Sequence, residues 1–432
     1  MSATTADVIV VGAGVVGAST ALELARSGRS VHVVDKAGGT GHGSTSASSA
    51  IVRFNYPTWD GVAAAWESRF GWDGWHDHLG MRPADGLATF SRCGMVFLDV
   101  DLMPAQHQAE LFDRAGVPYE LWGPDDLERR LRGLDAGRFW PPKPVTSGAF
   151  FDDPEGRLGA VFTPDAGVVD DPRLAAANLA EAAAHHGATF TFRRSVTAID
   201  RVGADWQVTL DDGSRLVAPV VVNAAGPWSS RINALARVGD DFTVTVAPMR
   251  QEVHHVPGPK GMADPLPVIA DADIGIYVRP DSAGNVLVGG TEPECDPLEW
   301  IDDPDASDPM PSRERFDTQV LRAARRLPGL AVPNRVRGIA GVYDVASDWR
   351  PIYDRTAEDG FFVAMGTSGN QFKNAPLIGT LMRALIDGVQ DGVDHDATPI
   401  TVTAPHTGHV IDLGTFSRRR ALDAETSGTV LG

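Results

Sequence analysis

The chain has 432 residues, 43% of them hydrophobic and 22% charged, which is the composition of a globular protein and excludes a mainly disordered one. Hydrophobic cores usually split beyond roughly 250 to 300 residues, so we expect two domains. The 38 Lys and Arg residues against 57 Asp and Glu give a net charge of −19, which disfavours nucleic acid and anionic membranes as partners.

Cysteine and histidine usage argues against disulfides and against a metal centre. Cys93 and Cys295 lie far apart and outside any Cys-x-x-Cys spacing. His254 and His255 are neighbours in an expected strand, so they point to opposite faces and cannot easily chelate one ion. Residues 1–6 are polar, no signal peptide is recognisable, and no apolar run approaches the roughly 20 residues of a membrane helix. We therefore expect a cytoplasmic protein without a bound metal.

The first 36 residues predict a strand, a helix and a second strand. Val8–Val11 and Val31–Val34 are continuous apolar runs, typical of strands buried in a parallel sheet. Between them, Ala18–Arg26 has helical spacing and ends at Gly28. This order is that of one βαβ unit.

The turn of this unit carries a nucleotide-binding fingerprint, Gly12-Ala-Gly-Val-Val-Gly17. In such a turn Gly12 reverses the chain, Gly14 lets the backbone approach a pyrophosphate, and Gly17 lets helix and strand pack closely. The helix N-terminus offers N–H groups to the phosphates. Asp35, after the second strand, can accept ribose hydroxyls and would repel the 2′-phosphate of NADP. The fingerprint predicts a dinucleotide site and leaves FAD and NAD both open.

Residues 38–49 consist almost entirely of Gly, Ser, Thr, Ala and His. This composition cannot pack a core and suits either a loop that wraps a ligand or a plain flexible surface loop. We favour the ligand-wrapping loop.

The remaining elements extend the βαβ unit and add a second domain. Strands are expected at Met95–Leu98, within 207–216, at 220–226, Ile274–Arg279, Val286–Gly289 and Phe361–Met365, and helices at Met103–Ala115, Pro172–His186, Arg313–Leu327 and Ala375–Ile386. The acidic, Pro-containing stretch 292–311 is expected to be a solvated loop, and 395–432 a tail lying over the surface. These elements predict a nucleotide domain from 1–84, 149–238 and 335–394, a substrate domain from 85–148 and 239–334, and a C-terminal tail from 395–432.

Three segments carry a family resemblance. Residues 44–56 read STSASSAIVRFNY, residues 220–228 read VVVNAAGPW, and residues 366–376 read GTSGNQFKNAP. They are similar to a Ser/Thr-rich loop, an Asn-Ala-Ala-Gly segment and a C-terminal glycine segment that surround the flavin in the D-amino-acid oxidase and sarcosine oxidase superfamily. This group includes glycine oxidase and dimethylglycine dehydrogenase. Smaller matches occur at 277–290 and 340–351.

The resemblance implies an α/β fold, with a Rossmann-type FAD-binding domain of the glutathione-reductase type and an α+β substrate domain with a mostly antiparallel sheet. It selects FAD over NAD. It implies an FAD-dependent amine or amino-acid oxidase or dehydrogenase that removes hydride from a carbon next to an amine nitrogen, giving an imine that water hydrolyses. The expected substrate is a small amino acid, N-methylated or cyclic, with O2 or another electron acceptor as partner. Homo-oligomerisation stays open.

Three departures from the family pattern qualify this picture. No Cys occurs within residues 340–343, where monomeric sarcosine oxidases attach their flavin, so noncovalent FAD is implied. Tyr277 aligns with a Lys associated with oxygen activation, which leaves the electron acceptor open. Tyr343 aligns with the carboxylate-binding Arg of glycine oxidases, so the resemblance does not imply that this chain binds its substrate as glycine oxidases do.

Cationic and aromatic residues near these motifs are the candidates for substrate binding. Arg53 can clamp a carboxylate bidentately or form an ordinary ion pair. Lys373 can stabilise negative charge at the flavin N1–C2=O edge, bind the carboxylate, or be a solvated lysine. Arg279 and Arg350 are weaker candidates, and Tyr277 and Tyr343 line the substrate face or belong to the core.

We assign the following residues to the FAD site: Gly12, Gly14, Val15, Val16, Gly17, Asp35, Lys36, Ser44, Thr45, Ser46, Ser48, Ser49, Val196, Ala225, Gly226, Trp228, Gly341, Gly369, Asn370, Gln371, Phe372 and Lys373. The reacting end is assigned to Arg53, Tyr277, Arg279, Tyr343 and Lys373. Two other functions stay open: an FAD-dependent 2-hydroxy-acid oxidoreductase, and a flavin-binding assembly protein without turnover.

Overall fold

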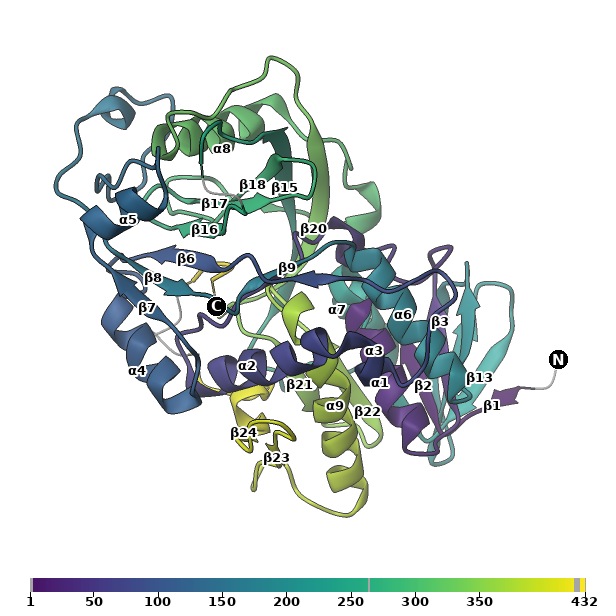
Figure 1. The fold of residues 1–432 in the computed structure, drawn as a ribbon. Coiled ribbons are helices and arrows are strands. Elements are labelled where there is room, and N and C mark those ends of the chain that lie inside the picture. The colour runs from purple at the N-terminus through teal and green to yellow at the C-terminus, as the bar shows by residue number, and fades with distance from the viewer. Residues whose placement is uncertain (1–2, 263–264, 423–427, 432) are drawn as a thin grey trace.

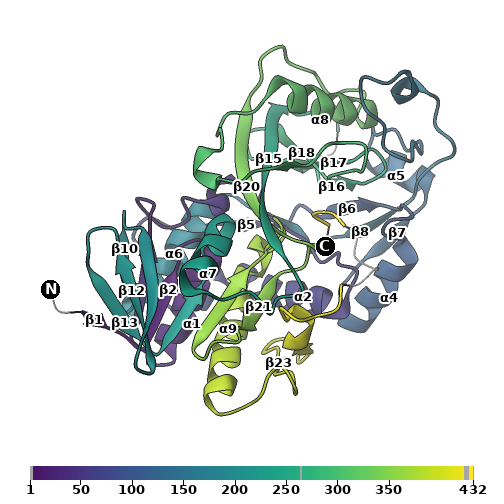
Figure 2. The ribbon, with the colours of Figure 1, turned by 180° about the vertical axis from the view of Figure 1, so that it is seen from behind.

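The chain forms two lobes that face each other across a central boundary (Figure 1). The computed structural model describes residues 3–262, 265–422 and 428–431. The lobe at the lower right of Figure 1 contains α1 (Val15–Arg26) and α6 (Pro172–His185), and the upper lobe contains α5 (Pro124–Arg130) and α8 (Arg313–Arg326). The reverse view in Figure 2 shows the same two bodies.

A six-stranded sheet is the centre of the first lobe. Its order is β10-β3-β2-β14-β22-β21, and all neighbours are parallel except β21, which runs antiparallel to β22. The strands are β10 (Thr189–Phe192), β3 (Val31–Asp35), β2 (Val8–Val11), β14 (Val220–Asn223), β22 (Phe361–Met365) and β21 (Ile352–Arg355). Every residue of β2, β14 and β22 is buried, as expected of strands covered on both faces.

The alternation of side chains along β2 shows what covers each face. Val8 and Val10 belong to the core formed with α1, α6 and α9 (Ala375–Gln390). Ile9 and Val11 belong to the core formed with a four-stranded sheet of order β1-β13-β12-β11. Its strands are β1 (Thr4–Thr5), β13 (Arg215–Ala218), β12 (Asp205–Leu210) and β11 (Val196–Val202), and α7 (Ser229–Ala236) lies beside it. The parallel sheet is therefore the middle layer of the lobe.

The upper lobe is built on a nine-stranded sheet. Its order is β19-β15-β18-β17-β16-β6-β8-β7, with β20 paired to β15, and every neighbouring pair is antiparallel except β16 with β6. The strands are β19 (Glu299–Trp300), β15 (Val246–Pro257), β18 (Asn285–Gly290), β17 (Ile276–Pro280), β16 (Val268–Asp271), β6 (Met95–Leu98), β8 (Ala160–Thr163), β7 (Glu120–Trp122) and β20 (Gly338–Ala346). Helix α8 packs on this sheet through Phe316, Val320 and Ala323.

Further elements connect the two lobes. A three-stranded sheet joins β4 (Ile51–Val52), β9 (Gly167–Val169) and β5 (Phe90–Ser91). The remaining helices and strands are α2 (Trp59–Asp73), α3 (Trp75–Leu79), α4 (Ala105–Ala115), and the hairpin of β23 (Thr401–Thr403) and β24 (Val410–Asp412). Helix α2 contacts both α9 and α4.

The C-terminal region differs from the expected surface tail. The side chain of Arg418 is fully buried and pairs with Asp241 at 2.7 Å, Asp396 at 2.8 Å and Asp354 at 3.1 Å. Residues 428–431, at the yellow end of the chain, lie in the middle of the molecule near β6 in both views (Figures 1 and 2). Leu431 is only 4% exposed. The tail prediction failed because the apolar contacts of Val430 and Leu431 come from elements far away in the sequence.

The expected fold class is confirmed: a parallel Rossmann-type sheet in one lobe and a mostly antiparallel sheet in the other. Most expected elements lie within a few residues of their predicted bounds, although α1 begins at Val15 and the expected loop at 38–49 contains a 3-10 turn, Ser44–Ala47. The domain boundaries remain a prediction. Strands β8 and β20 are hydrogen-bonded into the nine-stranded sheet, although both fall in ranges expected for the nucleotide domain.

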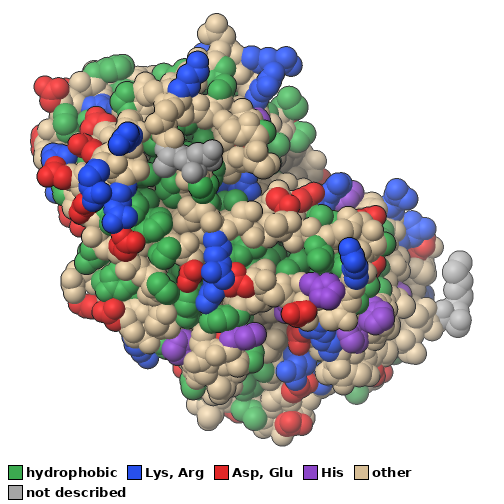
Figure 3. All heavy atoms as spheres, viewed as in Figure 1, with side chains coloured by type: hydrophobic (Ala, Val, Ile, Leu, Met, Phe, Trp, Pro, Cys, Tyr) green, Lys and Arg blue, Asp and Glu red, His purple; other side chains and the backbone are tan. Residues whose placement is uncertain are grey.

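The surface in Figure 3 mixes both signs of charge, with Lys and Arg side chains interspersed among Asp and Glu. Among the described residues, no helix is both long and apolar enough to cross a membrane.

Candidate functional site

A cavity of about 930 Å³ lies between the two lobes. The ends of β2, β3 and β14 contribute Val11, Val34 and Ala224 to its wall, and the nine-stranded sheet contributes Met95 and Ala270. Cavities of about 300 to 1,000 Å³ are typical ligand sites, and the carboxyl ends of parallel strands are where α/β sheets bind nucleotides.

The glycine turn lies at one end of this cavity. Gly12 has φ +107°, and a Cβ there would lie 2.3 Å from the carbonyl oxygen of Ala224. A Cβ at Gly17 would lie 2.0 Å from the carbonyl oxygen of Gly12. Gly12 and Gly14 line the cavity, whereas Gly17 does not line it and lets α1 approach the turn after β2. The turn therefore tolerates only glycine at its first and last positions.

Asp35 is held in place beside this turn. Its Oδ2 accepts a hydrogen bond from the Ala13 amide and its Oδ1 one from the Ala37 amide, both at 2.7 Å. A carboxylate has about four acceptor positions, so each oxygen can take a further donor. Asp35 lines the cavity, where a ribose hydroxyl can supply that donor.

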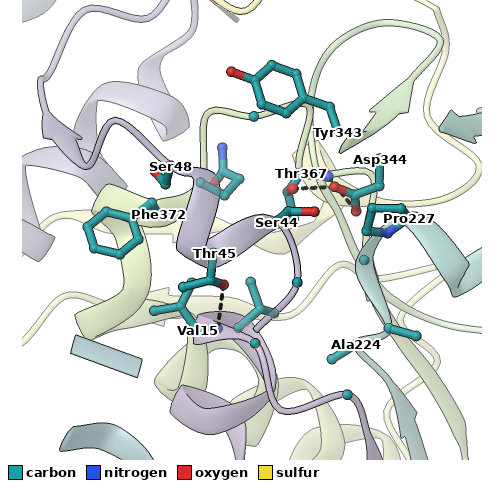
Figure 4. A pocket seen from close by; sticks show the side chains of 18 of the residues that line it. Val15, Ser44, Thr45, Ser48, Ala224, Pro227, Tyr343, Asp344, Thr367 and Phe372 are labelled. Atoms are coloured by element: carbon teal, nitrogen blue, oxygen red, sulfur yellow. Dashed lines mark hydrogen bonds between the residues drawn. The ribbon is translucent and has the colours of Figure 1, made fainter. Parts of the chain in front are cut away.

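The Ser/Thr-rich loop joins the nucleotide end of the cavity to the upper lobe. Thr45 Oγ1 accepts a hydrogen bond from the Val15 amide at 3.1 Å, as the dashed line in Figure 4 shows. Ser44 Oγ donates to the carbonyl of Val342 on β20. Ser49 Oγ and Tyr277 Oη on β17 are 2.6 Å apart. The loop is thus a wall of the cavity with contacts on both lobes.

A charged cluster lies beside the nucleotide end. The ammonium of Lys36 lies 3.7 Å from the ring centre of Trp228 and pairs with Asp305. Arg231 pairs with Asp305 at 3.3 Å and with Asp303 at 2.6 Å. The sequence predicted Lys36 and Trp228 for this site. It placed Asp305 in a solvated acidic loop, because nothing local showed that the loop folds back onto Arg231.

The glycine segment at 366–369 forms another wall. Gly369 has φ +70°, and a Cβ there would lie 2.3 Å from the ring of Tyr343. Thr367 donates to Asp344 through its amide at 3.1 Å and through its hydroxyl. Burial raises the pKa of Asp344, and the hydrogen bonds from Thr367 oppose that shift. In Figure 4, Tyr343 stands on the opposite side of the view from Val15 and Ala224.

Two tyrosines and two cations define the end of the cavity away from the glycine turn. Tyr277 lies against Gly289, where a Cβ would be 2.3 Å from the Tyr277 ring, and burial raises the pKa of Tyr277 to about 12. The side-chain nitrogen of Lys373, Nζ, donates to the hydroxyl of Tyr56 at 2.8 Å and to the carbonyl of Asn370. Burial, with Arg53 as a second positive charge nearby, holds the pKa of Lys373 well below its usual value.

Arg53 is 6% exposed and lines the same end. Its guanidinium donates to three backbone carbonyls, those of Asn55, Val430 and Leu431, the last two at 3.0 Å. Among the described residues, none of the ion pairs found involves Arg53. A buried guanidinium that holds only carbonyl oxygens can exchange them for a carboxylate, which it binds more strongly.

The cavity brings together most of the residues predicted for the site. Those that line it are Gly12, Gly14, Val15, Val16, Asp35, Lys36, Ser44, Thr45, Ser48, Ser49, Arg53, Val196, Ala225, Gly226, Trp228, Tyr277, Tyr343, Gly369, Asn370, Gln371, Phe372 and Lys373. The role of each in binding remains a prediction.

Five predicted residues do not line the cavity. Gly17 packs α1, and Ser46 bonds back to the carbonyl of Gly43 at 2.9 Å. A Cβ at Gly341 would lie 2.6 Å from Ala47, so this glycine lets β20 approach the loop. Arg279 donates to the carbonyl of Val169, and Arg350 pairs with Asp348.

Several lining residues were not predicted. Thr367 lies inside the quoted segment 366–376 and Asp344 inside the match at 340–351, so the resemblance covered both, but neither was assigned to the site. Val430 and Leu431 lie in a stretch without pattern, and no sequence signal identified them.

Fold and cavity together define an α/β protein with a site of the dinucleotide-binding type. Residues 7–385 match the family described as FAD dependent oxidoreductase, and the chain belongs to this family of enzymes. The chain is 29% identical to a glycine oxidase of Geobacillus kaustophilus over 425 residues, which cover 94% of this chain and 98% of that protein.

Two solved structures share the fold. The crystal structure of glycine oxidase from Geobacillus kaustophilus has a TM-score of 0.70 at 23% identity, covering 89% of this chain and 95% of that one. The crystal structure of L-proline dehydrogenase from P. horikoshii has a TM-score of 0.75 at 21% identity, covering 97% and 98%.

The residues present fit FAD. The glycine cradle at Gly12 leaves room for a pyrophosphate that a Cβ would fill, and Asp35 keeps acceptor capacity for a ribose. The far end of the cavity has the rings of Tyr277 and Tyr343 together with Arg53 and Lys373, so it offers both aromatic walls and positive charge to a flavin ring.

Proposed function

We propose that this enzyme oxidises the C–N bond of a small amino acid, most suitably a secondary amine such as an N-methylated or cyclic one. FAD, when bound, supplies the hydride acceptor. The residues of the chain bind and orient the substrate and keep the reacting end dry, and water then hydrolyses the imine product. The observation that carries the proposal is the placement of Arg53, buried and free of carboxylate partners among the described ion pairs, at the end of the cavity away from the nucleotide fingerprint.

Each residue at this end has a proposed task. Arg53 binds the substrate carboxylate. The pKa of Lys373 is held low by burial. A negative charge beside Lys373 would raise this pKa and favour the protonated form. Lys373 is therefore suited to stabilise negative charge at the N1–C2=O edge of the flavin. Tyr277 and Tyr343 supply apolar walls whose hydroxyls stay neutral, since burial raises the pKa of both.

Noncovalent attachment of FAD is part of the proposal. Denaturation in acid should release all yellow colour into the supernatant, and chromatography should identify the released compound as FAD. Flavin that stays with the precipitated protein would contradict noncovalent attachment, and a protein purified without any flavin would contradict the cofactor assignment for this chain.

Anaerobic bleaching tests the substrate class. The holoenzyme should lose its visible absorbance with members of a panel of sarcosine, glycine, L-proline and D-alanine, and not with 2-hydroxyglutarate or glycerol 3-phosphate. Glycine and L-proline are on this panel because a similar protein is named glycine oxidase and a similar structure is that of an L-proline dehydrogenase. If only the hydroxy compounds bleach the flavin, the enzyme oxidises an alcohol group and the proposed C–N oxidation is wrong.

A further inference from the structure

Val430 and Leu431 line the cavity at the end where the substrate is proposed to bind. The Val430 amide donates to Glu292 Oε2 at 3.3 Å, and the Val430 carbonyl accepts from Arg53 Nη2 at 3.0 Å. The Leu431 carbonyl accepts from the same nitrogen at 3.0 Å. The main chain of Val430 therefore lies between an acidic and a basic side chain, with its N–H toward the acid and its C=O toward the base.

The N–H and C=O groups of Val430 have the same order between Glu292 and Arg53 as the amine and carboxylate of a bound α-amino acid would have. In Val430 one carbon, Cα, separates the amide nitrogen from the carbonyl carbon. In an α-amino acid one carbon likewise separates the amine nitrogen from the carboxyl carbon. A group that reaches Arg53 through its carboxylate therefore brings its amine to the position of the Val430 nitrogen, next to Glu292.

We propose that Glu292 and Arg53 form a two-point site for α-amino acids, in which Glu292 binds the amine, and that residues 428–431 fill this site until a substrate displaces them. The proposal rests on the proposed function and deepens it, because it assigns the residue that distinguishes an amino acid from a plain carboxylic acid.

The backbone at Glu292 supports a built site. Glu292 has φ +52°, a left-handed conformation that non-glycine residues adopt rarely. Glu292 lies two residues after β18, whose last residues Gly289 and Gly290 lie beside Tyr277 and Glu292 respectively. Glu292 does not line the cavity itself: its carboxyl group contacts the amide of Val430, which does line it, so displacement of Val430 would expose this carboxyl group to the cavity.

The surroundings of Glu292 set its charge. Burial raises the pKa of Glu292 to about 8, and the nearby carboxylate of Asp296 acts in the same direction. The Val430 amide, Arg315 on α8 and the Gln251 side chain on β15 oppose this shift. The other titratable groups facing it are the hydroxyls of Tyr277 and Tyr343, whose pKa values it raises.

An ammonium group beside Glu292 stabilises its carboxylate, so binding of a protonated amine is coupled to loss of the Glu292 proton. Above about pH 8 the carboxylate is already formed in the free enzyme. We expect kcat/KM for amino-acid substrates to rise with pH up to about 8, since kcat/KM reports groups of the free enzyme.

Ligand binding to the oxidised holoenzyme tests the proposal without turnover. The probes are 2-aminoisobutyrate, which has no hydrogen on its α-carbon and cannot be oxidised there, and pivalate, in which a methyl group replaces the amine. Titration of the flavin absorbance should show that the wild-type enzyme prefers 2-aminoisobutyrate over pivalate by at least about tenfold.

Three variants separate the parts of the site. Glu292→Gln should lose the preference while keeping its affinity for pivalate, and the rise of kcat/KM toward pH 8 should disappear. Glu294→Gln, an exposed acid in the same turn, is the matched control and should behave as wild type. Leu431→Ala should bind both probes several-fold more tightly, because it removes the buried side chain that anchors the displaced segment.

An unchanged preference in Glu292→Gln, or unchanged or weaker binding of both probes to Leu431→Ala, would overturn the proposal. These results are independent of the substrate panel. If the enzyme discriminates between the probes but no amine bleaches its flavin, the two-point site stands and the proposed reaction is wrong. If amines bleach the flavin but the probes bind equally well, the reaction stands and the two-point site is wrong.

Discussion

The two ends of the central cavity are built in different ways. The nucleotide end consists of backbone: Gly12, Gly14 and the ends of parallel strands, with Asp35 fixed by two amides of its own βαβ unit. The substrate end consists of side chains that reach in from separate elements, with Arg53 after β4, Tyr277 on β17 and Lys373 before α9. The first end is defined by local geometry, and the second by long-range packing, so the two should respond differently to substitution.

The largest effect is expected at the nucleotide end. Gly12→Val places side-chain carbons against the carbonyl of Ala224, and overpacking of this kind costs about 3 kcal/mol, or more than about 100-fold in FAD affinity. Measured flavin content should fall accordingly. Gly28→Val is the matched control, because Gly28 has φ +88° but nothing within 4 Å of its Cβ position. Equal flavin loss in both variants would show that positive φ, not the close approach, sets the requirement.

The next effect separates the two ends. Arg53→Ala should lower kcat/KM for an amino-acid substrate by a factor on the order of 30 to several thousand, since truncating one partner of a buried charged pair costs about 2 to 5 kcal/mol. Flavin content should stay near one per chain. Arg279→Ala serves as control, because Arg279 is buried but does not line the cavity. If Arg279→Ala loses as much kcat/KM as Arg53→Ala at equal flavin content, Arg53 has no specific role.

A third substitution concerns the electron acceptor. We expect the wild-type enzyme to be reoxidised slowly by O2, because the resemblance to sarcosine oxidases aligns neutral Tyr277 with their oxygen-activating Lys. Tyr277→Lys should raise the rate of reoxidation in air about tenfold through the added positive charge, as measured by stopped flow after anaerobic reduction. Tyr277→Phe, which keeps the ring and adds no charge, should leave the rate unchanged. A rate that rises equally in both variants would point to loosened packing instead.

The smallest effect is on stability. The folded-state pKa of Lys373 is lowered, so between that pKa and the unfolded value near 10.4 the unfolded chain binds more protons, and this group makes stability rise with pH. Lys373→Met removes that contribution. The Tm of wild type relative to the variant should therefore increase by a few degrees between about pH 7 and pH 10. A Tm difference that is constant over this range would show that Lys373 keeps an ordinary pKa.

The same contrast explains what the sequence could predict. The fingerprint from Gly12 to Gly17 is local, and each glycine has a role that elementary geometry assigns. Arg53, Tyr277 and Lys373 have no such local signal and were found through resemblance to a family. Glu292 and Val430 were missed because they are 138 positions apart in the sequence, and only the fold shows that they form a hydrogen bond. Arg279 was assigned to the reacting end although its guanidinium points to the carbonyl of Val169, since strand periodicity does not show what lies beyond the sheet.

The loop from Ser44 to Ser49 has a consequence for the order of assembly in the cell. It is synthesised early, but its partners on the upper lobe, Tyr277 and Val342, emerge much later. At translation rates of about 5 to 20 residues per second, the loop waits on the order of 15 to 60 s for Val342. The glycine turn can meet a nucleotide during that interval, but the wall that encloses the ring cannot yet exist. The first lobe is also incomplete at that point, because β22 and α9 emerge after Val342. Capture of the cofactor is therefore a late event in the synthesis of this chain.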